Sequence, residues 1–337
     1  MLTSAMIIEQ FDPRADADSL RACYQIFLAA HDIDSPQTPA WSYRLFERAW
    51  VDGFGEDEAH ECWLASIAPG DPVGCYLLML PERENKTVAY TELVLAPEQR
   101  RAGSGTALFA HCADRARAAG RRRLWASVPD GTAGAAFAKA MGASQGIEQV
   151  LRTMPVDASL PDRLATLRAD AQPHAAGYEM LSWVLPSPAD RLSELAELHQ
   201  VMADAPRDAG IEPRAWDADR VRNLEQAIMA TGTRYYTVVA RHGATGQLAA
   251  MTEMAVDPQL PDWGVQQITT VRPGHRGHRL GLLVKIAMLD LLADREPAVR
   301  RILTGNAGEN QHMIAINELL GYRTTQTLRN WELDLVS

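Results

Sequence analysis

The chain has 337 residues, of which 47% are hydrophobic and 23% are charged, and its formal net charge at pH 7 is −10. This length fits two units of about 150 to 170 residues, each able to bury its own core, and the composition excludes a disordered chain. The acidic balance argues against nucleic acid as a partner, because Lys and Arg supply most of the affinity for phosphates, and no apolar stretch is long enough for a membrane span.

Hydrophobic periodicity in the first half predicts strands and helices in alternation. A strand at Ile7 and Ile8 is followed by helices over 16–30 and 42–50. Strands then follow over 62–67, 73–80 and 87–95. The last elements of this half are a helix over 106–119, a strand over 124–128 and a helix over 133–141.

Residues 157–177 contain two prolines and a polar helical stretch over 162–171, which indicates a connector. After it the same pattern begins again. We expect strands over 178–185, 235–241, 248–256, 264–271 and 301–303, and helices over 189–202, 214–229 and 314–320. The sequence therefore predicts two domains, 1–156 and 178–337, joined by 157–177.

One loop pattern occurs in both halves. Pro97 and Pro273 lie 176 positions apart, and the same offset relates Arg100 to Arg276 and Gly105 to Gly281. In each copy an apolar run precedes the loop and a helical pattern follows it directly. Strand, small-residue turn and helix expose unpaired helix N-terminal N–H groups, which bind phosphate.

The spacing Arg-x-x-Gly-x-Gly at Arg100, Gly103 and Gly105 resembles the acetyl-CoA signature of the GCN5-related N-acetyltransferase (GNAT) superfamily. A dinucleotide-binding Rossmann loop is the competing interpretation, but it needs an acidic ribose partner and lies near the start of a βαβ unit. The resemblance implies an α/β fold of two tandem GNAT domains, as in the mycothiol synthases. Each domain would be a mixed, mostly antiparallel sheet flanked by helices, with a splayed acetyl-CoA cleft.

The resemblance also implies acetyl-CoA as the cosubstrate, bound by the backbone amides of the loops. We expect no metal, because the sequence has no HExxH motif and no finger spacing. In the second loop Arg279 stands where the first has Gly103, so either the loop geometry differs or the guanidinium itself meets phosphate. The residues expected to bind acetyl-CoA are Val94, Leu95, Arg100, Arg101, Ala102, Gly103, Ser104, Gly105 and Thr106, then Thr270, Val271, Arg276, Gly277, His278, Arg279, Leu280, Gly281 and Leu282, and Asn310.

The second half matches more of the family's catalytic end. Asn310 and Gly321-Tyr322 fit a family pattern in which the Asn contacts the cofactor, but Asn317 stands where the family has the Tyr that protonates the thiolate. In the first half the corresponding positions hold neither Asn nor Tyr. The resemblance therefore places the reaction in the second half, with Asn317 at the position of the general acid.

Acetyl transfer to an amine also needs a base. Gln266 and Gln267 lie where the family often places it, and neither can accept a proton, so Glu253 on the preceding strand is the candidate base. A solvent-facing position on an alternating strand is its other interpretation. Glu92 is the counterpart in the first half. Glu253 and Asn317 are the candidate catalytic residues.

Substrate signals are few. Residues 202–219 carry five carboxylates and Trp216, which could hold a cationic amine by charge and cation–π contact or could be a solvated loop with helix N-caps at Asp217 or Asp219. We expect an N-acetyltransferase that acts on a primary amine of a small molecule. A protein amine as acceptor, and a non-catalytic acyl-CoA-binding or sensing protein, remain alternatives.

Other residues bear on the surroundings of the site. His275 and His278 flank Arg276 and could face phosphate or solvent, and His312 could reach the thioester or lie at the surface. The four cysteines show no metal-site spacing, so we expect reduced, mostly buried thiols. The N-terminus becomes acidic too early for a signal peptide. We expect a cytoplasmic protein, as a monomer or homodimer.

Overall fold

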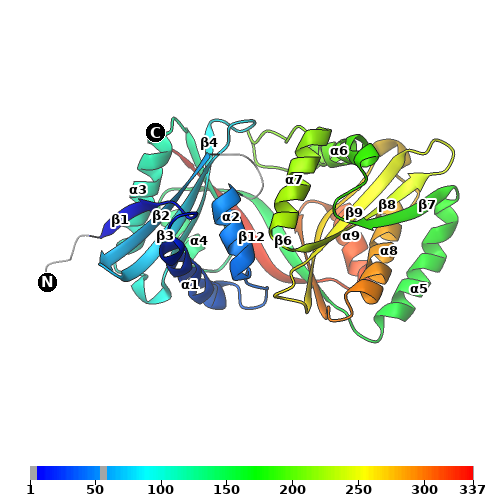
Figure 1. Cartoon of the computed structure of the whole chain (residues 1–337), viewed down its shortest axis with the longest axis horizontal. Helices are drawn as coiled ribbons and strands as arrows, with labels where there is room; N and C mark the ends of the chain where they lie inside the picture. Colours follow the sequence, from blue (N-terminus) through cyan, green and yellow to red (C-terminus); the bar gives the residue numbers. More distant parts are fainter. Residues whose placement is uncertain (1–5, 54–58, 337) are drawn as a thin grey trace. The chain divides into compact units, whose positions relative to one another are not determined.

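The computed structural model describes residues 6–53 and 59–336. The chain divides into two compact units (Figure 1). Unit 1 contains the chain up to Glu148, the short segment Asp208–Glu212 and the end from Gln326. Unit 2 contains Gln149–Arg207 and Pro213–Thr325. Each unit is described by itself below.

The same order of elements occurs twice: strand, two helices, three strands, helix, strand, helix, strand. The first series is β1 (Ile7–Phe11), α1 (Ala17–Asp34), α2 (Tyr43–Asp52), β2 (Ala59–Ala68), β3 (Asp71–Leu80), β4 (Val88–Leu95), α3 (Ser104–Ala118), β5 (Arg123–Pro129), α4 (Ala133–Ala140) and β6 (Ser144–Pro155). After α5 (Leu160–Ala171), the second is β7 (Tyr178–Val184), α6 (Leu192–Gln200), α7 (Ala218–Ala230), β8 (Arg234–His242), β9 (Leu248–Val256), β10 (Trp263–Val271), α8 (Leu280–Arg295), β11 (Arg301–Ala307), α9 (Gln311–Leu320) and β12 (Arg323–Asp334). The expected α/β fold with two similar halves is confirmed.

Each unit has one mostly antiparallel sheet. In unit 1 the strand order is β1-β2-β3-β4-β5-β12, and in unit 2 it is β6-β11-β10-β9-β8-β7. Only β4 with β5, and β10 with β11, pair in parallel among these strands of the described chain. Strand β12, from the end of the chain, pairs with β5 of unit 1, and β6, from the first half, pairs with β11 of unit 2. The two halves therefore exchange their last strands.

Because of this exchange, the boundaries of the two units differ from the domain boundaries expected from the sequence. Residues 149–156, placed in the first domain by the sequence, belong to unit 2, and residues 326–337, placed in the second, belong to unit 1. Residues 208–212 also belong to unit 1, although they lie deep in the second half. Hydrophobic periodicity identifies a strand but does not identify the strand that it pairs with. Domains predicted from it are therefore continuous segments of the chain.

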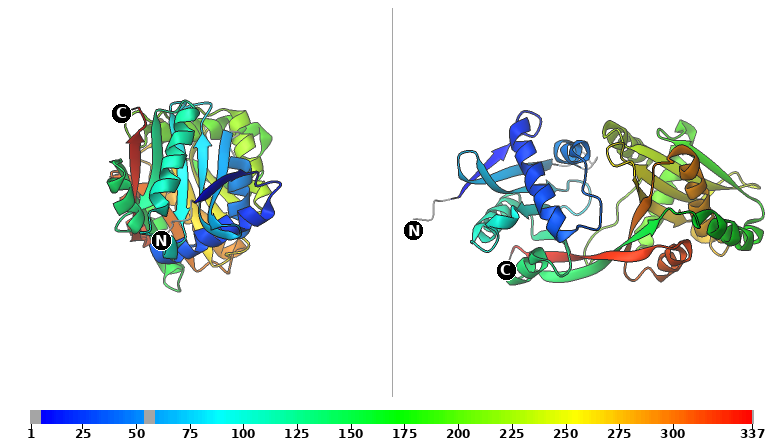
Figure 2. Two further views of the ribbon diagram at one scale, coloured as in Figure 1. Left: turned by 90° about the vertical axis from the view of Figure 1, so that its left-hand side faces the viewer. Right: turned by 90° about the horizontal axis from the view of Figure 1, so that it is seen from below.

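Each sheet is covered by helices on both faces (Figure 2). In unit 1, α3 packs on one face around Leu108 and Tyr76, and α1 with α2 packs on the other around Phe46 and Leu77. In unit 2, α5 and α8 cover one face, and α6 with α7 covers the other around Leu195 and Met251. Burial of apolar side chains on both faces, at roughly 25 cal/mol per Å², is the main stabilising contribution.

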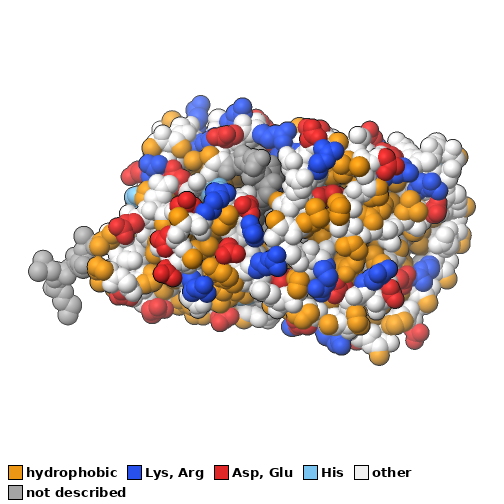
Figure 3. All heavy atoms as spheres, viewed as in Figure 1, with side chains coloured by type: hydrophobic (Ala, Val, Ile, Leu, Met, Phe, Trp, Pro, Cys, Tyr) orange, Lys and Arg blue, Asp and Glu red, His pale blue; other side chains and the backbone are white. Residues whose placement is uncertain are grey.

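The four cysteines are free and buried, as expected. Residues 6–53 and 59–336 contain no helix long and apolar enough to cross a membrane. On the face shown in Figure 3, acidic and basic side chains lie among one another.

Candidate functional site

The two loops have the same backbone conformation. Each begins with a short turn, Pro97–Gln99 or Pro273–His275, and then passes through two residues with positive φ. In unit 1 these are Arg101 (φ 69°) and Gly103 (φ 93°), and in unit 2 they are Gly277 (φ 87°) and Arg279 (φ 55°). Arg and Gly have therefore exchanged places within one conformation. Of the two alternatives for Arg279, an altered loop geometry is wrong.

Both loops end on a helix whose N-terminus has no side-chain cap within the described residues. Gly103 precedes α3 and Arg279 precedes α8, both in the left-handed conformation. By contrast, a side-chain oxygen caps each of five other helices, at Asp16, Ser42, Thr132, Asp217 and Asn310.

The uncapped helices leave backbone donors unpaired. In the part of the chain that the structure describes, the N–H groups of 101–106 in unit 1 and of 277–281 in unit 2 make no hydrogen bond. Successive N–H groups in such a turn form an anion-binding concavity at the positive end of the helix dipole. Both loops therefore fit the pyrophosphate of acetyl-CoA.

The loop arginines differ between the units. Arg100 makes a bidentate pair with Asp34 at the end of α1, at 3.0 and 2.7 Å. Arg276 lies 3.5 Å from Asp204, and this pair is largely exposed. Arg279 pairs with Asp170 on α5 at 2.7 Å. A phosphate must therefore compete with a carboxylate for each of these three side chains.

In both units the parallel strands diverge before the loop. Strands β4 and β5 pair only from Val88 to Tyr90, and β10 and β11 pair only from Trp263 to Gln266. The splay of the two strands that the family resemblance implies therefore begins beyond Tyr90 in unit 1 and beyond Gln266 in unit 2.

Unit 2 has a β-bulge at this point. The register of β10 against β9 shifts between Gln266, which pairs with Met254, and Thr269, which pairs with Thr252. Two residues of β10, 267 and 268, therefore stand opposite Glu253 alone. In unit 1, β3 and β4 pair in one unbroken register over the described residues 74–79 and 90–95. A bulge ends regular pairing and leaves backbone groups unpaired, which is common beside active sites.

Glu253 lies beside the bulge with its side chain buried, at 8% exposure. Its carboxylate accepts a hydrogen bond of 3.0 Å from the Tyr235 hydroxyl, and the ring nitrogen Nε2 of His199 lies 3.6 Å from its other oxygen. The ring of Trp216 stacks on His199 with centroids 4.3 Å apart. The solvent-facing interpretation of Glu253 is therefore wrong.

Burial gives this group of residues unusual acidities. Desolvation raises the pKa of the Glu253 carboxyl to about 7; the hydrogen bond from Tyr235 acts in the opposite sense, and the charge of Glu225 adds to the rise. Desolvation also lowers the pKa of His199 to about 4. At neutral pH His199 is therefore uncharged, and Glu253 is poised between its two protonation states, as a general base should be.

Glu92 on β4 is the corresponding group of unit 1. The residue is half-buried, and its carboxylate has no hydrogen-bond or ion-pair partner among residues 6–53 and 59–336. Desolvation raises the pKa of this carboxyl to about 7 as well. Unit 1 thus has a possible base but no bulge beside it.

The structure places Asn310 and Asn317 in local contacts. Asn310 caps α9 by accepting the N–H of Met313 at 3.2 Å. Asn317 is completely buried, and its Nδ2 donates to the side chain of Asn306 on β11 at 2.6 Å. No partner for its Oδ1 is present in the described chain. An amide gives up no proton at neutral pH, so Asn317 can orient neighbours but cannot act as the general acid.

The histidines of the second loop contact protein groups. Nδ1 of His275 lies 2.8 Å from the hydroxyl of Tyr178, and Nδ1 of His278 lies 2.9 Å from the carbonyl of His174. Burial, with nearby His242 and Arg272, lowers the pKa of His275. His312 is exposed on α9.

The five carboxylates of residues 202–219 all have partners. Asp204 pairs with Arg276, and Asp219 with Arg222. Asp217 caps α7. Asp208 and Glu212 accept hydrogen bonds from residues of unit 1. The structure therefore favours structural roles for these groups over a surface for cationic ligands.

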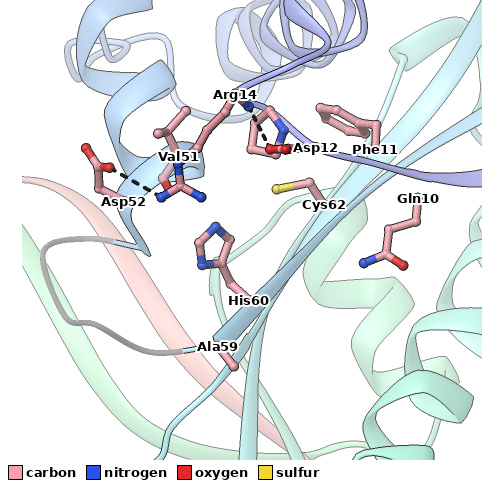
Figure 4. Close-up of a pocket in the computed structure, with 10 residues that line it drawn as sticks. Gln10, Phe11, Asp12, Arg14, Val51, Asp52, Ala59, His60 and Cys62 are labelled. Atoms are coloured by element: carbon pink, nitrogen blue, oxygen red, sulfur yellow. Dashed lines mark hydrogen bonds and ion pairs between the residues drawn. The ribbon is translucent and has the colours of Figure 1, made fainter.

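A separate cavity of about 770 Å³ lies in unit 1, at the end of α2 and beside β1 and β2 (Figure 4). Arg14 crosses it, donating to the carbonyl of Val51 at 2.7 Å and lying 3.8 Å from Asp52. No residue expected to bind acetyl-CoA lines it. Its lining residues are Gln10, Phe11, Asp12, Pro13, Arg14, Val51, Asp52, Ala59, His60 and Cys62.

Comparison with known proteins agrees with the geometry. The model of the acetyltransferase (GNAT) family matches residues 20–143. The solved structure of a tandem GNAT protein from the clavulanic acid biosynthesis pathway is 27% identical, with a TM-score of 0.81 over 98% of this chain and 99% of that one. The chain is a tandem member of the GNAT superfamily. It is accordingly an acyltransferase of the N-acetyltransferase type.

Other solved GNAT structures share the fold. A GCN5-related N-acetyltransferase from Sphaerobacter thermophilus is 13% identical, with a TM-score of 0.70 over 98% of this chain and 96% of that one. No curated protein matches the sequence.

The sequence did not link three residues to Glu253. His199 is the last residue but one of α6, Trp216 lies in the loop before α7, and Tyr235 is the second residue of β8. Each has an ordinary apolar or loop context in the sequence, and only packing brings them to one carboxylate. The signal available was Trp216 itself, a large aromatic residue in an acidic loop.

Proposed function

We propose that unit 2 transfers an acetyl group from acetyl-CoA to the primary amine of a small molecule, with Glu253 as the base. The observation that carries the proposal is a buried carboxylate, poised near neutral pH, directly opposite the bulge at which β10 leaves β11. Base, bulge and phosphate-binding loop thus occur on adjoining strands of one unit.

Different residues of unit 2 would bind the cofactor and accept the proton. The N–H groups of 277–281, with Arg276 and Arg279, would hold the pyrophosphate. Bound acetyl-CoA supplies an acetyl group activated as a thioester. Glu253 takes the proton that the amine must lose, directly or through water, and Tyr235 orients the carboxylate. Water protonates the departing thiolate, a mild demand because a free thiol has a pKa near 8.5.

A small-molecule acceptor is supported by the similarity to a tandem protein from the clavulanic acid biosynthesis pathway. Recognition of the acceptor by the acidic loop is not part of the proposal, because its five carboxylates are already paired. The amine would instead meet the aromatic surroundings of Glu253, formed by Trp216 and Tyr235.

A second candidate places the reaction in unit 1. Glu92 favours it, because the carboxylate of this half-buried residue has no partner in the described chain and its pKa is also raised to about 7. The unbroken register of β4 against β3 opposes it, because β4 has no bulge beside Glu92.

The test is release of the free thiol of CoA, measured with a panel of small primary amines. Wild type is compared with Glu253→Gln and the matched variant Glu92→Gln. We expect Glu253→Gln to lower kcat by at least ~100-fold, the usual contribution of a general base, while acetyl-CoA still binds. Loss of activity only in Glu92→Gln would move the reaction to unit 1, and acetyl-CoA binding without thiol release would favour the sensing alternative.

A further inference from the structure

Three histidines surround one tyrosine beside the second loop, all of them within unit 2. The ring centroids of His242, His275 and His278 lie 5.1, 5.7 and 5.3 Å from that of Tyr178. Tyr178 begins β7 and His242 ends β8, whereas the other two histidines belong to the loop itself. Imidazoles this close repel one another when they are charged, so protonation of one opposes protonation of the next.

The hydrogen bonds of His275 keep its ring neutral. Its Nε2–H donates to the side-chain oxygen of Gln247 at 3.2 Å, and its Nδ1 accepts the hydroxyl of Tyr178 at 2.8 Å. Burial, together with the basic groups nearby, lowers the pKa of this histidine. Both ring nitrogens are in use, so His275 holds the loop in place and has no donor left for a phosphate.

His278 differs because only one of its ring nitrogens is in use. Its Nδ1 lies 2.9 Å from the backbone carbonyl of His174. A carbonyl oxygen only accepts, so Nδ1 carries the proton and the neutral ring has a lone pair at Nε2. The ring is exposed, and Nε2 has no partner in the described chain. Neutral His278 therefore repels a phosphate oxygen at Nε2, whereas the imidazolium offers it an N–H donor and a positive charge.

The position of His278 in the loop makes this difference matter. It lies within the run of free N–H groups at 277–281. The two arginines beside it already pair with carboxylates, Arg276 with Asp204 and Arg279 with Asp170. Among the side chains at 276, 278 and 279, His278 alone has no carboxylate partner within the described residues.

We propose that protonation of His278 controls how tightly unit 2 binds acetyl-CoA, because only its imidazolium form can donate to a phosphate of the cofactor. The inference rests on the proposed function and adds pH regulation to the same site. Titratable and charged groups around this ring come from four elements: Tyr178 on β7, His242 on β8, Asp170 on α5, and His275, Arg276 and Arg279 in the loop.

The sign of the effect follows from linkage. A bound phosphate favours the charged ring, so acetyl-CoA affinity is highest at acid pH and falls as the pH rises through the range in which an imidazole loses its proton. The loop of unit 1 has Ala102 at the position of His278, 176 residues earlier, so its affinity lacks this contribution.

This dependence runs against that of the proposed base. Glu253 has to lose a proton, with a midpoint near pH 7, whereas His278 has to keep one. Both requirements fall on kcat/KM for acetyl-CoA, which should therefore be bell-shaped in pH. The falling limb should be absent in a variant with no titratable side chain at 278.

Calorimetric titration of the full chain with acetyl-CoA tests the proposal without turnover. Affinity is measured at about pH 5.5 and about pH 8, on either side of the range in which an imidazole titrates. We expect ~10-fold tighter binding at the lower pH in wild type, about the contribution of one charge-assisted hydrogen bond. His278→Gln should lose this difference, and His278→Lys, with a permanent charge, should bind tightly at both pH values.

The control is His312→Gln, which removes an exposed histidine of α9 and should behave as wild type. The 3′-phosphate of CoA itself takes up a proton near about pH 6. This contribution, and any binding to the loop of unit 1, is the same for every variant. The difference between wild type and His278→Gln therefore reports His278 alone.

CoA and dephospho-CoA, which lacks the 3′-phosphate, identify the phosphate concerned. An effect of His278 on both places the ring beside the pyrophosphate, and an effect on CoA alone places it beside the 3′-phosphate. The same pH dependence in wild type and His278→Gln would overturn the proposal. A Glu253→Gln protein that keeps full activity would refute the proposed function instead, and the binding result would stand.

Discussion

Replacement of Glu253 by Gln should stabilise the protein at alkaline pH. The folded protein raises the pKa of this carboxyl from its usual 4.5 to about 7 through burial, so the folded state binds the proton more tightly than the unfolded chain. The stability that this group contributes is therefore fully present below about pH 4.5 and is lost as the pH rises through 7. Glutamine is uncharged throughout and keeps an acceptor for the Tyr235 hydroxyl.

The expected change in the free energy of unfolding follows from 1.36 kcal/mol per tenfold change in proton affinity. Between pH 4.5 and pH 8 the stability of Glu253→Gln relative to wild type should grow by about 3 kcal/mol. Urea unfolding at several pH values measures it, with Glu318→Gln, an exposed residue of α9, as the control. A difference between Glu253→Gln and wild type that does not change with pH would refute the burial on which the proposed base depends.

Three further perturbations test other parts of the structure. Lys285→Met should raise the free energy of unfolding by roughly 2–4 kcal/mol at pH 6, and this gain should shrink toward pH 10. The reason is that burial lowers the pKa of the Lys285 amine to about 7. A gain that does not depend on pH would contradict this prediction. Gly103→Ala should cost about 1 kcal/mol in urea unfolding through its φ of 93° alone, since a Cβ there meets no described atom within 4 Å; a neutral result would argue against the left-handed N-cap. Gly281→Leu should weaken acetyl-CoA binding in calorimetry, since even a Cβ would lie 3.3 Å from Ile316, and unchanged affinity would exclude the second loop.

Local pattern and repetition predicted most of the fold. The loop offset of 176 positions identified the two halves, and Ser42 and Asp217 begin helices as N-caps do. The strand exchange was beyond such reasoning, because β6 and β12 have ordinary strand patterns whichever unit they join. The sequence does show that Arg279 stands in the second loop where the first has Gly103. It does not show that the two loops share one backbone conformation.

For the site, residue type made Glu253 a candidate base but said nothing of its surroundings. The acidic loop is an example: five carboxylates within residues 202–219 suggest a cationic ligand, yet three of them have partners far away in the sequence, as Glu212 has in Asn85. The bulge opposite Glu253 depends on register between strands, which no spacing along β10 alone determines.

The pH dependence of single-turnover acetyl transfer, followed by CoA thiol release, shows whether Glu253 is the base. We expect the wild-type rate to rise through a midpoint near pH 7, as Glu253 ionises. That midpoint should persist in Glu92→Gln and disappear in Glu253→Gln, along with most of the rate. A midpoint that survives in Glu253→Gln and disappears in Glu92→Gln would contradict the account and place the base in unit 1.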